Sequence, residues 1–112
     1  MKSGYKIFWT EHAASELEKT IQYLQTEFSD KEISKLLIKL EETLELISIN
    51  PKIFPISDKK GIHKAILLKY NSIYYREINN TVEILSFFSN RQNPKKKKNL
   101  TTHLQTSILQ LK

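Results

Sequence analysis

The sequence has no cysteine and very little glycine. Its 112 residues include two glycines, three prolines and no cysteine. The absence of cysteine excludes a disulfide framework and thiolate chemistry, and it fits the reducing environment of the cytoplasm. Two isolated glycines exclude a glycine-rich loop of the kind that cradles phosphate groups. A chain of this length is expected to form one domain around a single apolar core.

Long apolar runs are also missing. No run approaches the roughly 20 apolar residues that a membrane-spanning helix needs. The N-terminal stretch MKSGYKIFWT lacks the apolar core and the small-residue cleavage site of a signal peptide. We therefore expect a cytoplasmic protein with no membrane partner.

The usual metal ligands and nucleophiles do not form a recognisable motif. The three histidines, His12, His63 and His103, are scattered and have neither HxxxH spacing nor cysteine partners, so a metal site is not expected. No serine lies in a recognisable nucleophile turn with histidine and aspartate partners. The sequence predicts no metal and no cofactor.

The charge, by contrast, is large and uneven, with a net value of +6. Residues 1–56 hold seven Lys and nine Asp or Glu, a net charge of −2. Residues 57–112 hold eleven Lys or Arg and three acidic residues, a net charge of +8. A basic half of this kind attracts phosphate backbones or acidic proteins. Lysine runs are also often only solvated surface, so composition alone leaves both interpretations open.

The first half of the chain predicts a strand and two helices. Residues 5–10, YKIFWT, are aromatic and β-branched, as in a strand, and Thr10 is a suitable N-cap for the helix that follows. Ser29 and Glu32 have the spacing of a capping box for a second helix, which Asn50-Pro51 ends. Both helices carry apolar stripes: Ala13, Ala14, Leu17, Ile21, Leu24 and Phe28 on the first, and Ile33, Leu36, Leu37, Leu40, Leu44 and Ile47 on the second.

The second half predicts three strands. They cover residues 63–70, 72–78 and 81–89, and Asn79-Asn80 form the tight turn between the last two, because Asn tolerates left-handed backbone angles. The order β-α-α-β-β-β predicts an α+β fold. We expect a small, mostly antiparallel four-stranded sheet with the helical hairpin packed on one face and the other face open.

The C-terminal end has a different composition. We expect residues 1–94 to form the folded domain and residues 95–112 to form a basic tail. Apolar residues recur in the tail at spacings of four, four and three, which predicts a short amphipathic helix that packs on the domain or on a partner. These residues are Leu100, Leu104, Ile108 and Leu111.

Cations and phenols gather on the predicted sheet. Alternate residues of a strand share a face, so Tyr74 and Arg76 lie on one side of their strand, with Lys64 on the strand before and Arg91 after the last strand. Such groups bind RNA phosphates and stack bases, or stabilise a phosphoryl transition state; they are also ordinary on a solvated face. The candidates are Lys64, Arg76, Arg91 and His63 for catalysis, and Tyr74, Lys69, Lys95, Lys96, Lys97 and Lys98 for binding nucleic acid or a partner.

The ordered set of these segments, up to Pro94, resembles the RelE/ParE superfamily of toxins from bacterial type II toxin–antitoxin (plasmid stabilisation) modules. The opening YKIFWTEHAASELEKTIQYL resembles the first strand and helix of the family, and NPKIFPIS resembles the loop after its second helix. The stretch GIHKAILLKYNSIYYREINNTVEILSFFSNRQNP resembles the three-stranded sheet. Its ending, NRQNP, is similar to a form common in the ParE-like branch.

The resemblance implies the same α+β fold and a growth-inhibiting toxin that a cognate antitoxin holds inactive. RelE-like members cleave messenger RNA on the ribosome without a metal ion, whereas ParE-like members poison DNA gyrase. The antitoxin tails of such toxins are typically acidic and amphipathic. This implies that the antitoxin contacts the open sheet face, the lysine run 95–98 and the apolar residues of the tail, Leu100, Leu104, Ile108 and Leu111.

When the basic positions of the RelE-like nucleases are compared one by one with this sequence, only some of them hold a basic residue here. Lys64 matches a basic position of the second strand of RelE-like nucleases, and Arg91 matches one at the exit of the last strand. Two further positions that are usually basic in the nucleases are Ile66 and Ser72 here. Arg76 lies further along its strand, as in many ParE-like members.

A ribosome-dependent endoribonuclease therefore remains one interpretation among several. Cleavage without metal needs a base for the 2′-hydroxyl group and an acid for the leaving oxygen. His63 offers one of these groups, since histidine titrates near neutrality, and the sequence does not supply the other. The alternatives are a gyrase inhibitor, a non-catalytic basic binding module, and a decayed toxin that retains only the fold. The oligomeric state stays open.

Overall fold

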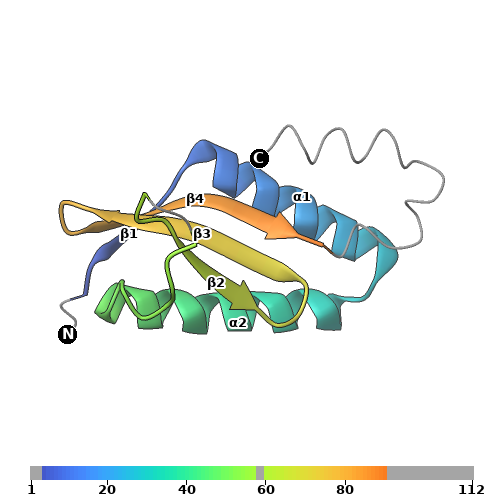
Figure 1. The fold of residues 1–112 in the computed structure, drawn as a ribbon. Helices are drawn as coiled ribbons and strands as arrows, with labels where there is room; N and C mark the ends of the chain where they lie inside the picture. The colour runs from blue at the N-terminus through green and yellow to red at the C-terminus, as the bar shows by residue number, and fades with distance from the viewer. Residues whose placement is uncertain (1–3, 58–59, 91–112) are drawn as a thin grey trace.

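A computed structural model describes residues 4–57 and 60–90. The elements are β1 (Lys6–Trp9), α1 (Glu11–Glu27), α2 (Asp30–Ile49), β2 (His63–Leu67), β3 (Asn71–Ile78) and β4 (Thr81–Ser89). The predicted order β-α-α-β-β-β and the α+β class are confirmed (Figure 1). The tail, residues 95–112, and its predicted helix lie outside the described residues.

The four strands form one mixed sheet in the order β1-β4-β3-β2. The pairs β2–β3 and β3–β4 are antiparallel hairpins, which makes the sheet mostly antiparallel, as expected. The first strand, however, pairs in parallel with the last, so that Ile7 lies opposite Val82 and Trp9 opposite Ile84. The two ends of the domain are therefore held side by side in the sheet, with the helical hairpin and β2–β3 between them in the sequence.

Thr10 joins the start of α1 to the sheet. Its hydroxyl oxygen accepts a hydrogen bond from the N–H of Ala13, at 3.1 Å, which is the predicted N-cap. The same hydroxyl donates to the carbonyl of Ile84 at 2.9 Å, and the N–H of Thr10 donates to that carbonyl at 3.2 Å. The first turn of α1 is thus fixed to β4 at the point where β1 ends.

The predicted capping box at the start of α2 is wrong in its detail. Ser29 is the N-cap residue, but its side chain makes no capping hydrogen bond. Its carbonyl instead accepts from the N–H of Glu32 at 3.0 Å. Because this is the N–H group that the serine hydroxyl would need in a capping box, the tight first turn replaces the side-chain cap.

The turn between β3 and β4 has the predicted conformation. Asn79 and Asn80 have φ angles of 47° and 62°, the left-handed values that a two-residue hairpin turn requires and that asparagine tolerates. This turn sets the register of the hairpin, in which Ile78 lies opposite Thr81 and Arg76 opposite Glu83.

The helices cover one face of the sheet, with α1 along β4 and α2 along β2 (Figure 1). Alternate residues of the strands point to this face and are buried, as a half-covered sheet requires. The apolar core consists of Ala13, Leu24, Leu36, Leu40, Ile47, Ala65, Leu67, Ile73, Tyr75, Val82, Ile84 and Phe87. Leu36, Leu40 and Ile47 of the stripe predicted for α2 are buried and Leu37 is exposed. In the α1 stripe, Ala14 and Phe28 are exposed.

Candidate functional site

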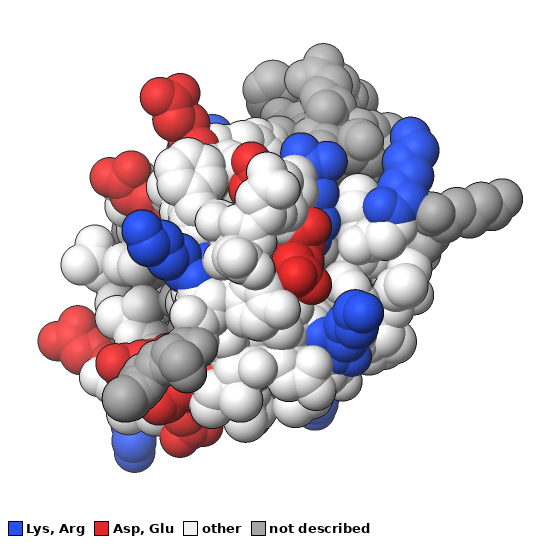
Figure 2. Space-filling view, turned by 90° about the vertical axis from the view of Figure 1, so that its left-hand side faces the viewer, with Lys and Arg blue, Asp and Glu red and all other residues white. Residues whose placement is uncertain are grey.

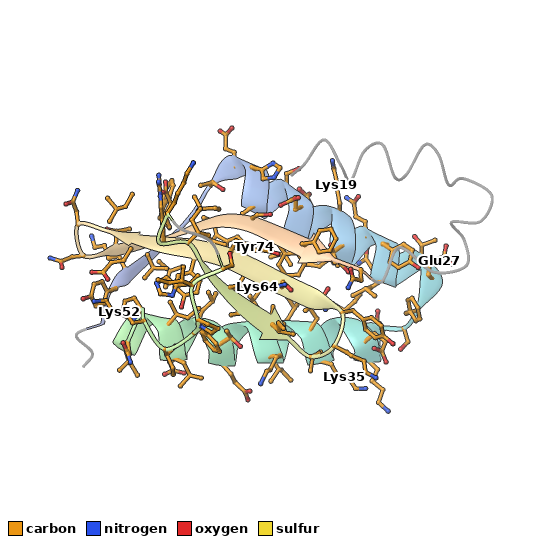
Figure 3. The ribbon with its side chains drawn as sticks, in the orientation of Figure 1. Lys19, Glu27, Lys35, Lys52, Lys64 and Tyr74 are labelled. Carbon is orange, nitrogen blue, oxygen red and sulfur yellow. The ribbon has the colours of Figure 1, made fainter. Side chains whose placement is uncertain are left out.

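The open face of the sheet brings two of the predicted residues together. Lys64 on β2 lies opposite Tyr74 on β3, and the Nζ atom of Lys64 lies 5.7 Å from the centroid of the Tyr74 ring. This is within the range of a cation–π contact. Figure 3 shows the two residues near the middle of the sheet. Both side chains are partly exposed, so the pair is accessible to a ligand or a partner.

Arg76, the second cation predicted for this face, is held by a carboxylate. Its Nε atom donates to Oε1 of Glu83, on the neighbouring strand, at 2.8 Å. Its side chain remains 45% exposed and that of Glu83 24% exposed. An arginine in such a pair already directs donors at a protein anion, so binding a phosphate through those donors would require the pair to break.

The open face also carries an exposed apolar side chain on each edge strand. Ile66 is 59% exposed and Phe8, on β1, is 54% exposed. Ile66 lies opposite Ser72 on β3, and Phe8 lies opposite Glu83 on β4. Ser72 and Ile66, the two positions that are usually basic in the nucleases, therefore form a neutral cross-strand pair.

His63 lies on the opposite, helix-covered face. It is 8% exposed, and its Nδ1 lies 2.6 Å from the carbonyl oxygen of Phe54. Its ring stacks on Tyr75, with centroids 5.1 Å apart, and the Tyr75 hydroxyl donates to the carbonyl of Pro51 at 2.7 Å. His63 and Tyr75 thus anchor the loop after α2, and alternation along β2 separates His63 from Lys64 by the thickness of the sheet.

Burial also affects the ionisation of Tyr75. Removal from water raises the pKa of Tyr75 to about 12, because an ionised phenolate is less well solvated inside the protein. The neutral phenol is the form that donates the hydrogen bond to the Pro51 carbonyl.

Lys69 lies in the turn between β2 and β3, away from the pair of Lys64 and Tyr74. Its Nζ lies 6.0 Å from the centroid of the Tyr70 ring. The preceding residue, Leu68, has a φ angle of 57°, which is uncommon for a residue with a large side chain, and it is 49% exposed. Leu68 and Lys69 line a hollow of about 500 Å³ against Ile38 of α2.

Several predicted residues lie outside the described part of the chain. These are Arg91, Lys95, Lys96, Lys97, Lys98, Leu100, Leu104, Ile108 and Leu111. Their roles stay predictions.

Sequence reasoning missed the role of Glu16. This residue of α1 is 8% exposed, and its Oε1 accepts hydrogen bonds from the N–H of Phe87 at 2.9 Å and from the hydroxyl of Ser86 at 3.0 Å. Nε2 of His12, one turn earlier, lies 3.2 Å from the same oxygen. Glu16 therefore accepts hydrogen bonds from the part of the β4 edge that lies beyond the end of β1. This part is next to a register shift in the pairing of β3 with β4.

The charged side chains do not form one continuous basic patch on the face seen in Figure 2. That view shows the end of the molecule with the β3–β4 turn, and Lys, Arg, Asp and Glu are interspersed there among uncharged residues. Within residues 4–57 and 60–90, no group of three His, Asp or Glu residues is placed to hold a metal ion. None of the helices in this part of the chain is long and apolar enough to span a membrane.

Comparison with known families agrees with the fold and identifies the family. The family model of the ParE toxin of the type II toxin–antitoxin system, parDE, matches residues 7–94. The chain belongs to the ParE toxin family. As a member of a family of type II toxins, this ParE-family chain is expected to have a cognate antitoxin partner.

A solved structure is similar to this ParE-family chain in its fold. It is described as the chromosomal ParDE TA system from P. aeruginosa, with 16% sequence identity and a TM-score of 0.64, and the similarity covers 76% of this chain and 95% of the other. At this identity the likeness shows the fold alone. A search of curated proteins found no match.

Proposed function

We propose that this ParE-family protein is a growth-inhibiting toxin that binds DNA gyrase, and that an acidic cognate antitoxin neutralises it. Membership of the family supports the toxin role, and the resemblance to the ParE-like branch supports gyrase as the target. The observation that favours gyrase over messenger RNA is the state of the basic residues on the open face. Arg76 is engaged by Glu83 at 2.8 Å, and His63 is buried on the other face.

RNA cleavage without metal needs a general base, a general acid and cations around one phosphate. Lys64 is a cation on the open face, and its nearest aromatic partner is Tyr74. His63, the predicted acid or base, has its Nδ1 on the Phe54 carbonyl and lies on the far side of β2 from Lys64. These positions do not assemble a cleavage site within the described residues.

Two exposed apolar side chains on the open face favour a protein partner. Exposed apolar surface that is bordered by polar groups is typical of protein–protein contacts. Phe8 on β1 and Ile66 on β2 are each more than half exposed. Arg76 lies on β3, between these two edge strands, and Lys64 lies two residues before Ile66 on β2. This arrangement fits a contact with another protein, the antitoxin in one state and the target in the other, better than a contact with RNA.

The proposal is tested by inducing the protein in bacterial cells and examining both targets. We expect growth arrest with filamentation, relief of the arrest by the antitoxin encoded beside the toxin gene, and gyrase–DNA cleavage complexes when purified toxin is added to gyrase and supercoiled DNA. Primer extension on transcripts after induction should show no new cuts.

The controls separate the alternatives. Strong codon-periodic cuts in transcripts with unchanged gyrase activity would replace gyrase by messenger RNA as the target, and would give catalytic roles to Lys64, Arg76 and His63. No arrest at high expression of a folded protein would support the decayed toxin or the non-catalytic binding module. Because gyrase and transcripts are cytoplasmic targets, we also propose that the protein is located in the cytoplasm. That location needs a test of its own.

A further inference from the structure

An apolar groove runs along the flank of α1. It has a volume of about 420 Å³ and is lined by Trp9 at the end of β1 and by Ala14, Leu17, Glu18 and Ile21 of α1. Trp9, Leu17 and Ile21 are partly buried, and Ala14 and Glu18 are exposed. The groove is therefore an apolar surface that the described residues cover only in part.

The groove follows from the way α1 packs on β4. The residues of α1 that are buried are Ala13, Glu16, Thr20 and Leu24. Two of the four are polar: Glu16 accepts from the N–H of Phe87 on β4, and the Thr20 hydroxyl donates to the carbonyl of Glu16. Leu17 and Ile21 each follow one of these polar residues, about 100° further round the helix. They consequently lie beside the buried line instead of in it.

We propose that the C-terminal segment of this chain, residues 95–112, occupies the groove as an amphipathic helix. Its apolar side pairs with the side chains of Trp9, Leu17 and Ile21. The residues on that side are Leu100, Leu104, Ile108 and Leu111.

The segment starts within reach of the groove. The described chain ends at Asn90, whose N–H donates to the carbonyl of Tyr70. Phe87, three residues earlier, is bonded to Glu16 of α1, and Leu17 and Ile21 lie within the next two turns of that helix. Nine residues separate Asn90 from Leu100, and they span up to about 30 Å when extended. The connection is thus long enough.

The lengths of the two surfaces also agree. A helix rises 1.5 Å per residue, so the stripe from Leu100 to Leu111 is about 16 Å long. The groove on α1 from Ala14 to Ile21 is about 10 Å long by the same measure, and Trp9 extends it beyond the start of the helix. A helix of three turns therefore covers it from end to end.

The charge of α1 favours the C-terminal segment over the other candidate occupants of the groove. The helix α1 carries four glutamates and one lysine, a net charge of −3, whereas residues 91–112 carry six basic residues and no acidic one, a net charge of +6. Glu11 and Glu18 are both exposed and, being seven residues apart, lie on the same side of α1. An acidic antitoxin segment or the acidic α1 of a second copy would be repelled there, while Lys95–98 are attracted.

The single tryptophan of the chain, Trp9, provides the test, because it lines the groove. In the full-length protein, we expect Leu104→Glu combined with Ile108→Glu to increase acrylamide quenching of Trp9 at least twofold and to shift its emission to longer wavelength. Thr106→Glu combined with Gln105→Glu is the matched control, since it adds the same charge outside the apolar stripe. The control should match the parent protein.

A second variant tests the groove from the other side. Glu18→Lys reverses the charge beside the groove and should make Trp9 more accessible at low salt, with the difference from the parent shrinking in high salt, since screening weakens the attraction. Circular dichroism would verify that each variant is folded. Quenching that is identical in the parent and the stripe variant would overturn the proposal. Shielding of Trp9 that appears only after antitoxin is added would assign the groove to the antitoxin instead. Neither readout depends on toxicity.

Discussion

Glu16 on α1 accepts a hydrogen bond from the backbone N–H of Phe87 on β4, with Oε1 2.9 Å from the nitrogen. The two residues are 71 positions apart in the sequence. β1 pairs with β4 only as far as Ile84, so the edge of β4 beyond that point needs other partners. The carboxylate of Glu16 supplies one, and it does so from a largely buried position.

Replacing Glu16 tests this contact. Glu16→Ala leaves the N–H of Phe87 without its acceptor, and we expect it to lower the free energy of unfolding by roughly 1–3 kcal/mol. Glu16→Gln keeps an oxygen acceptor and should cost less. Urea denaturation measures both, and Glu18→Ala, at an exposed position of the same helix, is the control. Equal stability of the parent and Glu16→Ala would show that the contact contributes nothing.

Leu40 tests the packing of the helical hairpin. It is 6% exposed in the core, so Leu40→Ala should cost about 2–5 kcal/mol through lost burial and the cavity that remains. Leu46, on the same helix, is 47% exposed, and Leu46→Ala should cost much less. A cost below about 0.5 kcal/mol for Leu40→Ala, the size typical of surface substitutions, would contradict its place in the core.

The raised pKa of Tyr75 predicts that the folded protein loses stability at alkaline pH. Burial raises its pKa from 10.0 to about 12, so the unfolded chain releases the phenolic proton at a lower pH than the folded protein does. The stability that the neutral phenol contributes is complete below pH 10.0 and is lost as the pH rises towards about 12. Denaturation at a series of pH values should show a shallower loss for Tyr75→Phe than for the parent. Tyr74→Phe, at a partly exposed position, should behave like the parent.

Lys64 is the cation of the open face that we expect to contact the target. Lys64→Met removes the charge beside Tyr74 and keeps most of the apolar stem. We expect the free energy of unfolding to change by no more than about 0.5 kcal/mol, as for other surface positions, while the induction level needed for growth arrest rises severalfold. Lys52→Met, at an exposed position after α2, is the control. Undiminished toxicity of Lys64→Met would remove Lys64 from the proposed contact.

The prediction for Arg91 rests on the sequence alone, because this residue lies outside the described residues. We expect Arg91→Ala to leave the melting temperature nearly unchanged and to reduce toxicity, as for a residue that binds a partner at the rim of the open face. Lys112→Ala removes the same charge at the far end of the tail and should have little effect. A large drop in melting temperature for Arg91→Ala would instead indicate a structural ion pair.

Local sequence patterns were sufficient for the elements of the fold. The cap at Thr10 is formed as predicted, α2 ends before Asn50-Pro51, and Asn79-Asn80 adopt the left-handed turn. These features depend on residues within a few positions of one another, and steric and hydrogen-bond preferences at that range act independently of the rest of the chain. The alternation along β3 likewise predicted that Tyr74 and Arg76 share the face opposite Tyr75.

Only the tertiary structure decided which polar residues meet. The sequence did not reveal that β1 pairs in parallel with β4, that Glu16 lies under the edge of β4, or that Arg76 is engaged by Glu83. Each of these depends on strand order and register, which bring together residues that are distant in sequence and which the pattern of any one segment does not specify. His63 shows the same limit: its residue type allows acid–base chemistry, but its place on the buried face, bonded to the carbonyl of Phe54, makes it an anchor for a loop.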